Sequence, residues 1–431
     1  EKFQDGTVKC IEDEIPFEVP EGWSWARLRD ICMMSAGKSK STVHIKSEPF
    51  EGSYPCFGGN GVRGYVDEYN QDGIFSIVGR QGALCGNINI AIGKFYATEH
   101  AVVTTLFDGI DFKWSNYILE ALQLNNYATG AAQPGLSVAN ILNVFVPVPP
   151  TQEQDRIGNN VYESLKIVEA LEQEKIDLQK NIITAKTKIL DLAICGKLVP
   201  QDPNDEPASV LLERIRAEKE ELIKQGKIKR DKKESVIFRG DDNSYYENLP
   251  HNWQVTSLRE ITTPLTLNDG DWILSQNMVN IGEVKLLQLG SIGNMIYLDK
   301  GFKYLTIDTF NELCCTEIFS GYLLINRIIN DKMCCCIVPQ INGKIITTVD
   351  TCWIAPTETS YDIKFLMYQL ASPNFQNKVL SKTSGTTRRR ISKSNLIDLP
   401  LFLPPLDEQR RIVEAIEKIF IKLDEIVSQV V

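Results

Sequence analysis

The sequence predicts an α+β fold in which two β-rich domains are separated by long coiled-coil helices, arranged as an internal pseudo-repeat. The first observation is a Pro-Pro-x-x-Glu-Gln-x-x-Ile motif that starts at Pro149 and again at Pro404. The second is an apolar-Pro-x-x-Trp motif followed by Leu-Arg-acid-Ile, which contains Trp23 and later Trp253. The third is the heptad spacing of apolar residues after each Pro-Pro pair, which is typical of coiled-coil helices. Two motifs that recur in the same order indicate a duplication.

The two repeated motifs divide the chain into six segments. Each half opens at its Trp motif, continues through a globular region and ends in a helix that starts at a Pro-Pro pair. The segments are a polar N-terminal tail (1–18), a first β-rich domain (19–148), a long helix (149–196), a charged connector with a short helix (197–248), a second β-rich domain (249–403) and a shorter C-terminal helix (404–431).

The two globular regions are predicted to be β-rich because short alternating apolar runs lie between turn residues. Examples are residues 73–78 in the first region and 321–325 in the second. Such runs bounded by Gly, Asn and Pro are typical of strands. The regions share little sequence between their ends, so we expect two binding domains that use one scaffold for different ligands.

Each Pro-Pro pair marks a junction between a strand and a helix, because proline lacks an amide donor and clashes with a preceding helical turn. At about 1.5 Å per residue, the first helix is expected to reach roughly 60 Å. The second helix is shorter, which leaves open whether the chain is truncated or another chain completes the helical bundle. The residues predicted to pack along the two seams are Ile157, Val161, Val168, Leu171, Leu178, Ile182 and Ile189 in the first helix, and Ile412, Ile416, Ile419, Leu423 and Ile426 in the second.

The composition excludes some classes of protein. A chain of 431 residues is too long for one hydrophobic core, so at least two domains are expected. No apolar run is long enough for a membrane span, and no signal peptide is visible. Eleven cysteines without zinc-ligand spacing favour reduced, mostly buried thiols in a cytoplasmic protein. The net charge of −10 argues against nonspecific nucleic-acid binding by the whole surface, but it leaves room for a local basic face.

A basic cluster before the second Pro-Pro pair is the main candidate for contact with DNA. No acidic residue occurs at positions 375–397. Guanidinium groups bind phosphates and can read guanine edges, whereas the alternative is an ordinary solvated loop. The first half has a neutral loop with Gln133 at the matching place, so the two domains would contact DNA differently. The cluster comprises Lys378, Lys382, Arg388, Arg389, Arg390 and Lys393, and the weaker candidates in the first half are Arg80, Gln81 and Arg63.

Other short patterns favour structural roles over catalytic ones. The loop at Gly59 matches G-x-G-x-x-G, but no helix opening follows, so a hairpin or surface loop is expected. Asp271 with Glu283 and Lys285 formally fits a D…E-x-K nuclease pattern, which is short and common by chance. No methyltransferase tetrapeptide of the Asn-Pro-Pro-Tyr type is present, and the three histidines lack a partner pattern for a triad or metal cluster.

The two Trp motifs, the two Pro-Pro junctions and the Gly-Lys-Leu-Val-Pro segment at 196–200 together resemble the specificity (HsdS-type) subunit of type I restriction–modification enzymes. The resemblance covers nearly the whole chain. It implies a non-catalytic subunit with two target-recognition domains, 19–148 and 249–403, which each read one half of a split sequence in double-stranded DNA. The long helices between these domains would pack antiparallel as a coiled coil and act as a ruler for the nonspecific spacer.

The same resemblance implies partner subunits. Two modification subunits would dock on the helices, bind S-adenosylmethionine and methylate adenine, and restriction–translocase subunits that use ATP and Mg²⁺ would cleave unmodified DNA. No cofactor and no metal are expected in this chain. Two alternatives stay open from the residues alone: a coiled-coil adaptor that never reads DNA, and a self-contained nuclease or methyltransferase that depends on the Asp271 pattern or the Gly59 loop.

Overall fold

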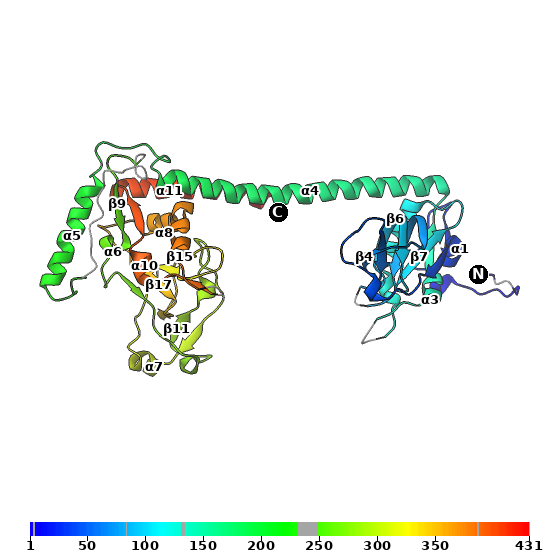
Figure 1. The fold of residues 1–431 in the computed structure, drawn as a ribbon, viewed down its shortest axis with the longest axis horizontal. Coiled ribbons are helices and arrows are strands. Elements are labelled where there is room, and N and C mark those ends of the chain that lie inside the picture. Colours follow the sequence, from blue (N-terminus) through cyan, green and yellow to red (C-terminus); the bar gives the residue numbers. More distant parts are fainter. Residues whose placement is uncertain (3–4, 83, 131–133, 232–248, 386–387, 431) are drawn as a thin grey trace. The chain divides into compact units, whose positions relative to one another are not determined.

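The computed structural model describes residues 1–2, 5–82, 84–130, 134–231, 249–385 and 388–430. The chain forms two compact units, Glu1–Glu174 and Lys175–Val431, and each is described by itself (Figure 1). The boundary between the units falls inside α4 (Thr151–Ile194), a single helix of 44 residues. The long helix predicted at 149–196 is therefore one continuous element. Among the residues that the structure describes, no helix is long and apolar enough to cross a membrane.

The first unit is rich in strands. Its elements before α4 are η1 (Glu12–Glu14), β1 (Ser24–Arg27), α1 (Leu28–Ile31), β2 (Cys32–Ala36), η2 (Thr42–His44), β3 (Tyr54–Gly58), β4 (Gly61–Val66), β5 (Gln71–Gly79), β6 (Ile88–Ala97), β7 (Ala101–Leu106), α2 (Phe112–Ala121), η3 (Leu124–Tyr127), α3 (Val138–Leu142) and β8 (Phe145–Val148).

The second unit mixes short strands with more helix. After α4 come α5 (Ala208–Lys224), β9 (Gln254–Ser257), α6 (Leu258–Ile261), β10 (Leu267–Asp269), η4 (Ser275–Asn277), β11 (Val284–Leu287), η5 (Leu289–Ser291), β12 (Lys303–Leu305), α7 (Ile307–Glu312), β13 (Leu323–Asn326), β14 (Ile328–Ile329), β15 (Cys335–Ile337), β16 (Lys344–Thr347), β17 (Thr351–Ile354), α8 (Ile363–Ala371), α9 (Pro373–Ser381), β18 (Arg389–Arg390), α10 (Lys393–Ile397), β19 (Pro400–Leu403) and α11 (Leu406–Val430).

A six-stranded sheet with the order β2-β7-β5-β6-β3-β4 forms the body of the first unit. Neighbouring strands are antiparallel except β3 and β6, which are parallel. The alternation of side chains along β5 supplies two cores, because Ile77 packs with Phe95 on one face while Val78 packs with Trp114 of α2 on the other. The helices α2 and α3 cover the Val78 face, so the predicted β-rich α+β class is confirmed for this unit.

The second unit carries several smaller sheets. A four-stranded sheet has the order β10-β17-β13-β15, and a three-stranded sheet has the order β12-β11-β16. The strand pair β11 and β16 is parallel, while the other pairs in these two sheets are antiparallel. The helices α8 and α9 contribute Phe365 and Phe375 to the main core, and both side chains are almost fully buried. The two units therefore share an α+β class without sharing a sheet order.

The two repeated motifs meet in each unit. The strand of the first Trp motif, β1, pairs antiparallel with β8, which directly precedes the Pro-Pro pair at Pro149. The strand of the second Trp motif, β9, pairs in the same way with β19, which precedes Pro404. The predicted strand-to-helix junction is thus confirmed twice, and the repeat is a structural frame around two different domains.

A glutamine of each Pro-Pro motif ties the long helix to its domain. The side-chain carbonyl of Gln154 accepts from the amide of Asp111 at 2.9 Å, and its side-chain amide donates to the carbonyl of Pro149 at 2.9 Å. Asp111 caps α2, so the glutamine joins the starts of two helices. Gln409 makes the same bonds in the second unit, at 2.8 Å to the N-cap residue of α8 and at 3.0 Å to Pro404. We call this arrangement the glutamine clamp.

An arginine of each Trp motif also repeats its contacts. In the first unit this arginine donates to an asparagine before β8 and to a carboxylate of the N-terminal segment, both at 2.6 Å. In the second unit it makes ion pairs with one aspartate before β19 and another after α5. The two sets are Arg29 with Asn143 and Glu1, and Arg259 with Asp398 and Asp231.

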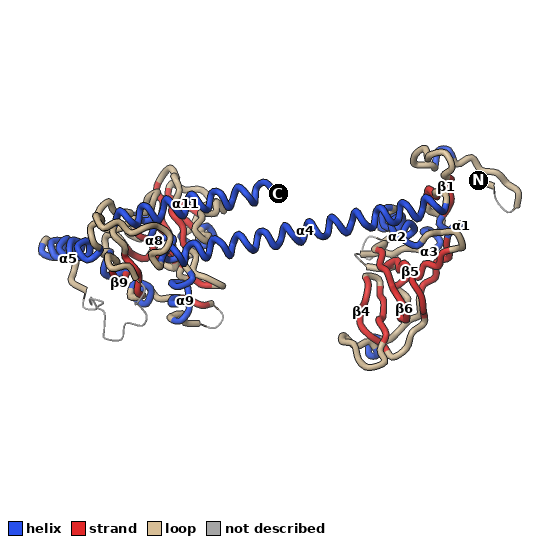
Figure 2. The backbone as a smooth tube through the Cα atoms, turned by 90° about the horizontal axis from the view of Figure 1, so that it is seen from above, coloured by secondary structure: helices blue, strands red, loops and turns tan. Residues whose placement is uncertain are grey.

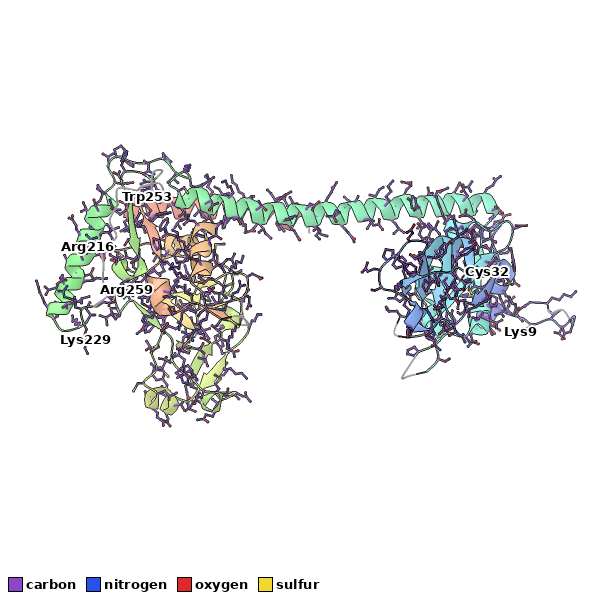
Figure 3. All side chains as sticks on the ribbon, in the orientation of Figure 1. Lys9, Cys32, Arg216, Lys229, Trp253 and Arg259 are labelled. Carbon is purple, nitrogen blue, oxygen red and sulfur yellow. The ribbon has the colours of Figure 1, made fainter. Side chains whose placement is uncertain are left out.

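The end of α4 is fixed by the second Trp motif (Figure 3). The buried indole of Trp253 donates to Glu408 at 3.0 Å, and Gln201 donates to the other oxygen of the same carboxylate at 2.5 Å. Burial raises the pKa of Glu408. Gly196 ends the helix with φ +67, and a Cβ there would lie 2.4 Å from a ring atom of Pro250. The Gly-Lys-Leu-Val-Pro segment therefore turns tightly onto the Trp motif, which explains why it needs glycine.

Within the second unit, the end of α4 runs antiparallel to α11. Lys186 pairs with Asp424 at 2.6 Å, while Gln201, just after α4, contacts Glu408 at the start of α11. Figure 2 shows the two helices side by side in this region. Leu190 of α4 belongs to the same core as α11, so the predicted antiparallel packing is confirmed for this part of the helix.

The predicted seam residues divide into three groups. Those toward the ends of α4 and at the start of α11 are buried or half-buried, and four of them, Ile157, Ile189, Ile412 and Ile416, belong to or pack against the two cores. Val168 and Leu171 in the middle of α4 are 49% and 58% exposed, and Ile426 near the end of α11 is 44% exposed. The pairing of these exposed seam residues with another helix stays a prediction. The first group comprises Ile157, Val161, Leu178, Ile182, Ile189, Ile412, Ile416, Ile419 and Leu423.

The N-terminal segment and the cysteines complete the fold. Residues 1–18 were expected to form a tail, but the carboxylate of Glu1 pairs with Arg27 at 2.8 Å and Phe17 packs on Trp25 with ring centroids 4.9 Å apart. The segment therefore docks on the first unit through complementary charge and an aromatic contact. All eleven cysteines are free thiols and most are buried, as predicted. Burial raises the pKa of Cys32 to about 12, so this thiol stays protonated.

Candidate nucleic-acid interface

The three arginines of the basic cluster lie on a short, anchored hairpin between α9 and α10. The strand β18 contains Arg389 and Arg390 and pairs antiparallel with β14. The buried side chain of Arg327 lies beneath it and donates to the carbonyl of Val349. Arg327 also pairs with Asp269 at 3.2 Å, so its buried charge is compensated. The hairpin is therefore held by backbone pairing with β14 and by the bond from the amide of Ile391 to the carbonyl of Arg327 at 3.1 Å.

Asp350 links two of these arginines. Its carboxylate pairs with Arg390 at 3.0 Å and with Arg388 at 3.5 Å. The side chains of Arg388 and Arg390 are 67% and 41% exposed, and Arg389 is exposed beside them. One carboxylate shared by two guanidinium groups orients both, and the three arginines together keep a net positive charge. These arginines can still bind phosphate or a guanine edge bidentately.

Arg388 and Arg390 line a cleft of about 640 Å³ together with Lys303, Gln288 and Trp272. We call this space the second-unit cleft. The lining residues come from the hairpin, from β12, and from segments that follow β10 and β11. Cationic, amide and aromatic side chains in one cleft are the groups that bind phosphates, base edges and base faces. The cleft is the strongest candidate site in the second unit.

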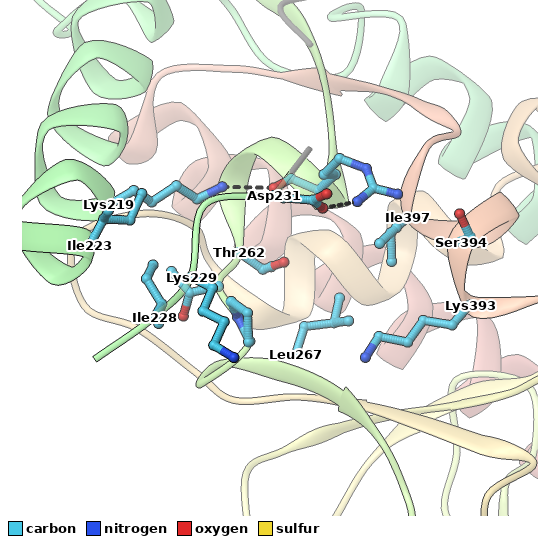
Figure 4. Close-up of a pocket in the computed structure, with 13 residues that line it drawn as sticks. Lys219, Ile223, Ile228, Lys229, Asp231, Thr262, Leu267, Lys393, Ser394 and Ile397 are labelled. Carbon is cyan, nitrogen blue, oxygen red and sulfur yellow. Dashed lines mark hydrogen bonds and ion pairs between the residues drawn. The ribbon is translucent and has the colours of Figure 1, made fainter. Parts of the chain in front are cut away.

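The remaining lysines of the basic cluster lie elsewhere. Lys393 donates to Asn268 at 2.5 Å and lines a separate cavity of about 320 Å³ between α5, α6 and α10 (Figure 4). Lys382 is exposed after α9, and its carbonyl accepts from Asn395 at 3.4 Å. The structure therefore groups the arginines with the second-unit cleft and places Lys393 at another site, although these residues are close in sequence.

Lys378 points into the domain. Its ammonium donates to the carbonyl of Pro400 at 3.3 Å and lies 4.8 Å from the centre of the Phe402 ring. Burial lowers the pKa of Lys378 to about 8. A lysine held in this way does not present its charge to a phosphate, so the geometry argues against the DNA contact predicted for Lys378. The helix α9 turns this side chain inward, on the face that also buries Phe375 and Val379.

Lys378→Met is expected to stabilise the second unit and to leave DNA binding unchanged. The folded-state pKa of about 8 lies below the ordinary lysine value of about 10.4, so folding disfavours the proton. The unfavourable contribution is present in full below pH 8 and disappears as the pH rises toward 10.4. The variant should raise the thermal midpoint by about 2–4 °C at pH 7 and less at pH 10. Thermal unfolding at both pH values, with a DNA titration at pH 7, checks this expectation, and a fall in DNA affinity would contradict it.

In the first unit, the Gly59 loop is a hairpin turn between β3 and β4, as expected. Arg63 and Gln81 line a common cavity of about 540 Å³ with the turn and His100. A Cβ on Gly79 would lie 2.0 Å from the carbonyl oxygen of Gly59, so only glycine permits this close contact between β5 and the turn. The glycines thus shape a pocket that brings two predicted site residues together.

The other first-unit candidates have different positions. Arg80 is half-buried, and its backbone bonds to His100 and Leu136 at 2.9 and 2.8 Å. These bonds hold the start of the loop that carries Gln81. Gln133 lies outside the described residues. The first-unit cavity therefore contains one arginine and one glutamine of the predicted set, in contrast to the two arginines of the second-unit cleft.

The residues of the nuclease-like pattern have structural partners. The carboxylate of Asp271 accepts from the amide of Thr316 at 2.9 Å. Glu283 accepts from the amide of Ile307 at 3.3 Å, and Lys285 donates to the carbonyl of Asn342 at 2.8 Å. Within the described ranges, no group of three or more His, Cys, Asp or Glu residues is arranged to hold a metal ion.

Sequence reasoning missed several residues of the second-unit cleft: Trp272, Gln288, Lys303 and Asp350. Trp272 carried no signal of exposure, because the Ile273-Leu274 pair that follows it is typical of a buried segment. The other three are common surface residue types. Only the strand pairing shows that they lie near the arginines.

Two α+β domains on one repeated frame, joined through a long helix and carrying different clefts, define a duplicated two-domain architecture. A family model for the type I restriction modification DNA specificity domain matches residues 20–188 and 250–430. The chain belongs to this family, the specificity subunits of type I restriction–modification systems. The resemblance inferred from the sequence motifs is confirmed.

Several known proteins are similar to this chain. The type I restriction enzyme EcoprrI specificity subunit of Escherichia coli is 50% identical over 148 residues, which are 34% of this chain and 35% of that protein. The EcoEI specificity subunit of Escherichia coli is 30% identical over 275 residues, which are 59% of this chain and 42% of that protein. The matched parts thus span less than half of each of these relatives.

Solved structures show the same fold. The HsdS subunit from Thermoanaerobacter tengcongensis superimposes with a TM-score of 0.53 at 15% identity, over 96% of this chain and 92% of that one. A structure that describes complex assembly and conformational transition of the type I R-M system gives a TM-score of 0.58 at 15% identity, over 96% and 94%. At this identity the likeness concerns the fold alone.

Proposed function

We propose that the chain reads a bipartite site in double-stranded DNA and directs adenine methylation or restriction by partner subunits. The observation that carries the proposal is one structural frame that occurs twice around two clefts of different chemistry. A duplicated frame with unlike clefts suits recognition of two unlike half-sites. The relatives named above are type I restriction enzyme specificity subunits, which supports the same reading.

In this proposal the second unit contacts one half-site through Arg388 and Arg390, which line the cleft, and through Arg389 beside them. Arginine binds phosphates and guanine edges, and the hairpin holds the three side chains on a fixed backbone. The first-unit cavity contacts the other half-site through Arg63 and Gln81, a pair that suits a mixture of guanine and adenine edges. The two units would therefore recognise different bases.

The proposal places the chemistry on partner subunits. Two modification subunits would bind S-adenosylmethionine, and restriction–translocase subunits would use ATP and Mg²⁺, while this chain supplies no catalytic residue. The middle of α4 supports a role in assembly, because its apolar residues are largely exposed: Ile167, Val168, Leu171 and Ile176 are each at least 49% exposed. Contiguous exposed apolar residues on a helix are typical of a protein–protein contact.

A domain exchange tests the proposal. The chain is co-expressed with its modification subunits, and methylated adenines are mapped across the host genome. Residues 19–148 are then replaced by the corresponding domain of another specificity subunit whose half-site is known. We expect a bipartite motif in the first map, and after the exchange a change in one half of the motif while the other half and the spacer stay constant.

The matched control is an exchange of residues 249–403, which should change only the opposite half. A methylation map without a bipartite motif would contradict DNA reading by this chain. A change in both halves after a single exchange would contradict the assignment of one half-site to each unit.

A further inference from the structure

Trp272 is an exposed tryptophan in the second-unit cleft. Its side chain is 69% exposed, although tryptophan is a large apolar residue that folded proteins usually cover. Leu274, two residues further on, is 46% exposed and lines the same cleft. No part of the proposed DNA contact through the arginines explains why this indole is presented to solvent.

The backbone just before Trp272 is anchored at Gly270 and Asp271. The amide of Asp271 donates to Thr347 at 2.9 Å, and the carbonyl of Asp271 accepts from Val349 at 2.9 Å. A Cβ on Gly270 would lie 2.5 Å from the carbonyl oxygen of Thr347, so the segment presses closely against the end of β16. The Asp271 carboxylate adds a third anchor through its bond from Thr316. The indole is therefore an exposed aromatic group on a fixed support, which lowers the entropy cost of using it in binding.

The surroundings of the indole favour a nucleic acid over an apolar protein surface. Lys303, Arg388 and Arg390 bring three positive charges to the cleft, and Gln288 adds an exposed amide. The acidic residues at the cleft are Asp350, which the two arginines share, and Asp271, whose carboxylate is engaged by a backbone amide. An aromatic face next to cationic groups is the combination that stacks on a base while neighbouring phosphates are neutralised.

We propose that Trp272 is a DNA-contacting residue of the second unit, which stacks its indole on a base of the half-site that has left its stack in the duplex, while Gln288 faces the edge of a neighbouring base. The proposal rests on the proposed DNA-reading function and assigns to it a contact that depends on aromatic stacking. Stacking of this kind requires a flat ring, so an apolar side chain of similar size does not replace it. It involves no charge, so it contributes to affinity without contributing to salt dependence.

The test uses the chain assembled with its modification subunits and a duplex that contains the mapped methylation site. Trp272→Ala, Trp272→Leu and Trp272→Phe are compared by DNA titration at several salt concentrations. We expect Trp272→Ala and Trp272→Leu to lose about 10- to 100-fold in affinity, with the slope of affinity against salt unchanged, and Trp272→Phe to retain most of the affinity. Duplexes with single replacements in the second half-site should lose affinity for the Ala variant by a similar factor, whereas Gln288→Ala should relax the choice at one adjacent position.

Ile281→Ala is the matched control, because Ile281 is 90% exposed on the same stretch of chain and does not line the cleft. This control should bind as the parent does. Full affinity of Trp272→Leu would overturn stacking, and loss of assembly with the modification subunits in Trp272→Ala would show a protein contact instead. If Trp272→Ala binds DNA normally while a variant with Arg388, Arg389 and Arg390 replaced by Ala does not, the stacking proposal fails and DNA reading stands. If neither set affects binding, DNA contact by this cleft fails as well.

Discussion

Replacing Arg388, Arg389 and Arg390 together with Ala is expected to weaken DNA binding by about 100-fold or more and to flatten its salt dependence. Each bidentate contact to a base contributes about 1–3 kcal/mol, and each lost phosphate contact lowers the salt slope by about 0.9. The three side chains extend from one anchored hairpin, so their removal leaves the backbone pairing of β14 with β18 in place. Titration of the assembled complex at four or more salt concentrations measures both quantities.

Replacing each arginine singly with Ala should separate the roles of the three side chains in DNA binding. Arg388 and Arg390 line the second-unit cleft and share Asp350, so we expect each to affect the choice of base in the second half-site. Arg389 is exposed between them and alternates to the other side of the strand, so its loss should weaken binding by a similar factor on every sequence. Lys378→Met is the matched control, because it removes a positively charged side chain of the same unit that does not line the cleft. If the triple variant and the parent had equal affinity and equal salt slope, the arginines would not contact DNA and the hairpin would be an ordinary solvated loop.

The frame of the protein could be predicted from the sequence because its signals are local. Proline pairs interrupt backbone hydrogen bonding wherever they occur, so the motifs at Pro149 and Pro404 mark strand-to-helix junctions in any context. The repeated Trp motifs could be aligned by eye, and their strands indeed pair with the strands before the prolines. Heptad spacing likewise predicts a helix from a few residues. These features depend on neighbours in sequence, which the sequence displays directly.

The clefts could not be predicted in the same way, because they join distant segments. Trp272, Gln288 and Arg388 come together only through the pairing of short strands whose order differs from that of the first unit. In the basic cluster, the sequence instead grouped residues that the structure separates. Lys378 is close to the arginines in sequence, and yet its ammonium is turned toward Phe402. Proximity along a chain that alternates between helix and hairpin does not decide which side chains share a face.

The N-terminal segment shows a further limit. Its polar composition predicted a tail, whereas Arg27 and Arg29 hold its first residue by charge. Arg29 also binds Asn143, the residue that corresponds in the repeat to the aspartate bound by Arg259. This second occurrence of the arginine contact could have been inferred from the repeat, because the partner residues align in both halves. The repeated frame therefore carried more structural information than the motifs alone.

Replacing Gln409 with Ala is expected to destabilise the second unit by about 2–4 kcal/mol. The side chain is fully buried and makes two bonds of the glutamine clamp, to the amide of Asp362 and to the carbonyl of Pro404. Truncation leaves both backbone groups buried without a partner, and each such group costs about 1–3 kcal/mol. The amide of Asp362 should then lose protection against hydrogen exchange ahead of the rest of α8.

Gln154→Ala should cause the same loss in the first unit, because its clamp has the same two bonds at 2.9 Å each. Urea unfolding of each variant, followed by hydrogen exchange read separately for residues 1–174 and 175–431, separates the two effects. The control is Gln152→Ala, which removes an exposed glutamine from the same helix turn and should change the free energy of unfolding by less than about 0.5 kcal/mol. If Gln409→Ala lowered protection in both units equally, the clamp would stabilise the chain as a whole rather than each domain. Loss confined to the mutated unit would establish that the repeated glutamine fastens each recognition domain to its own helix.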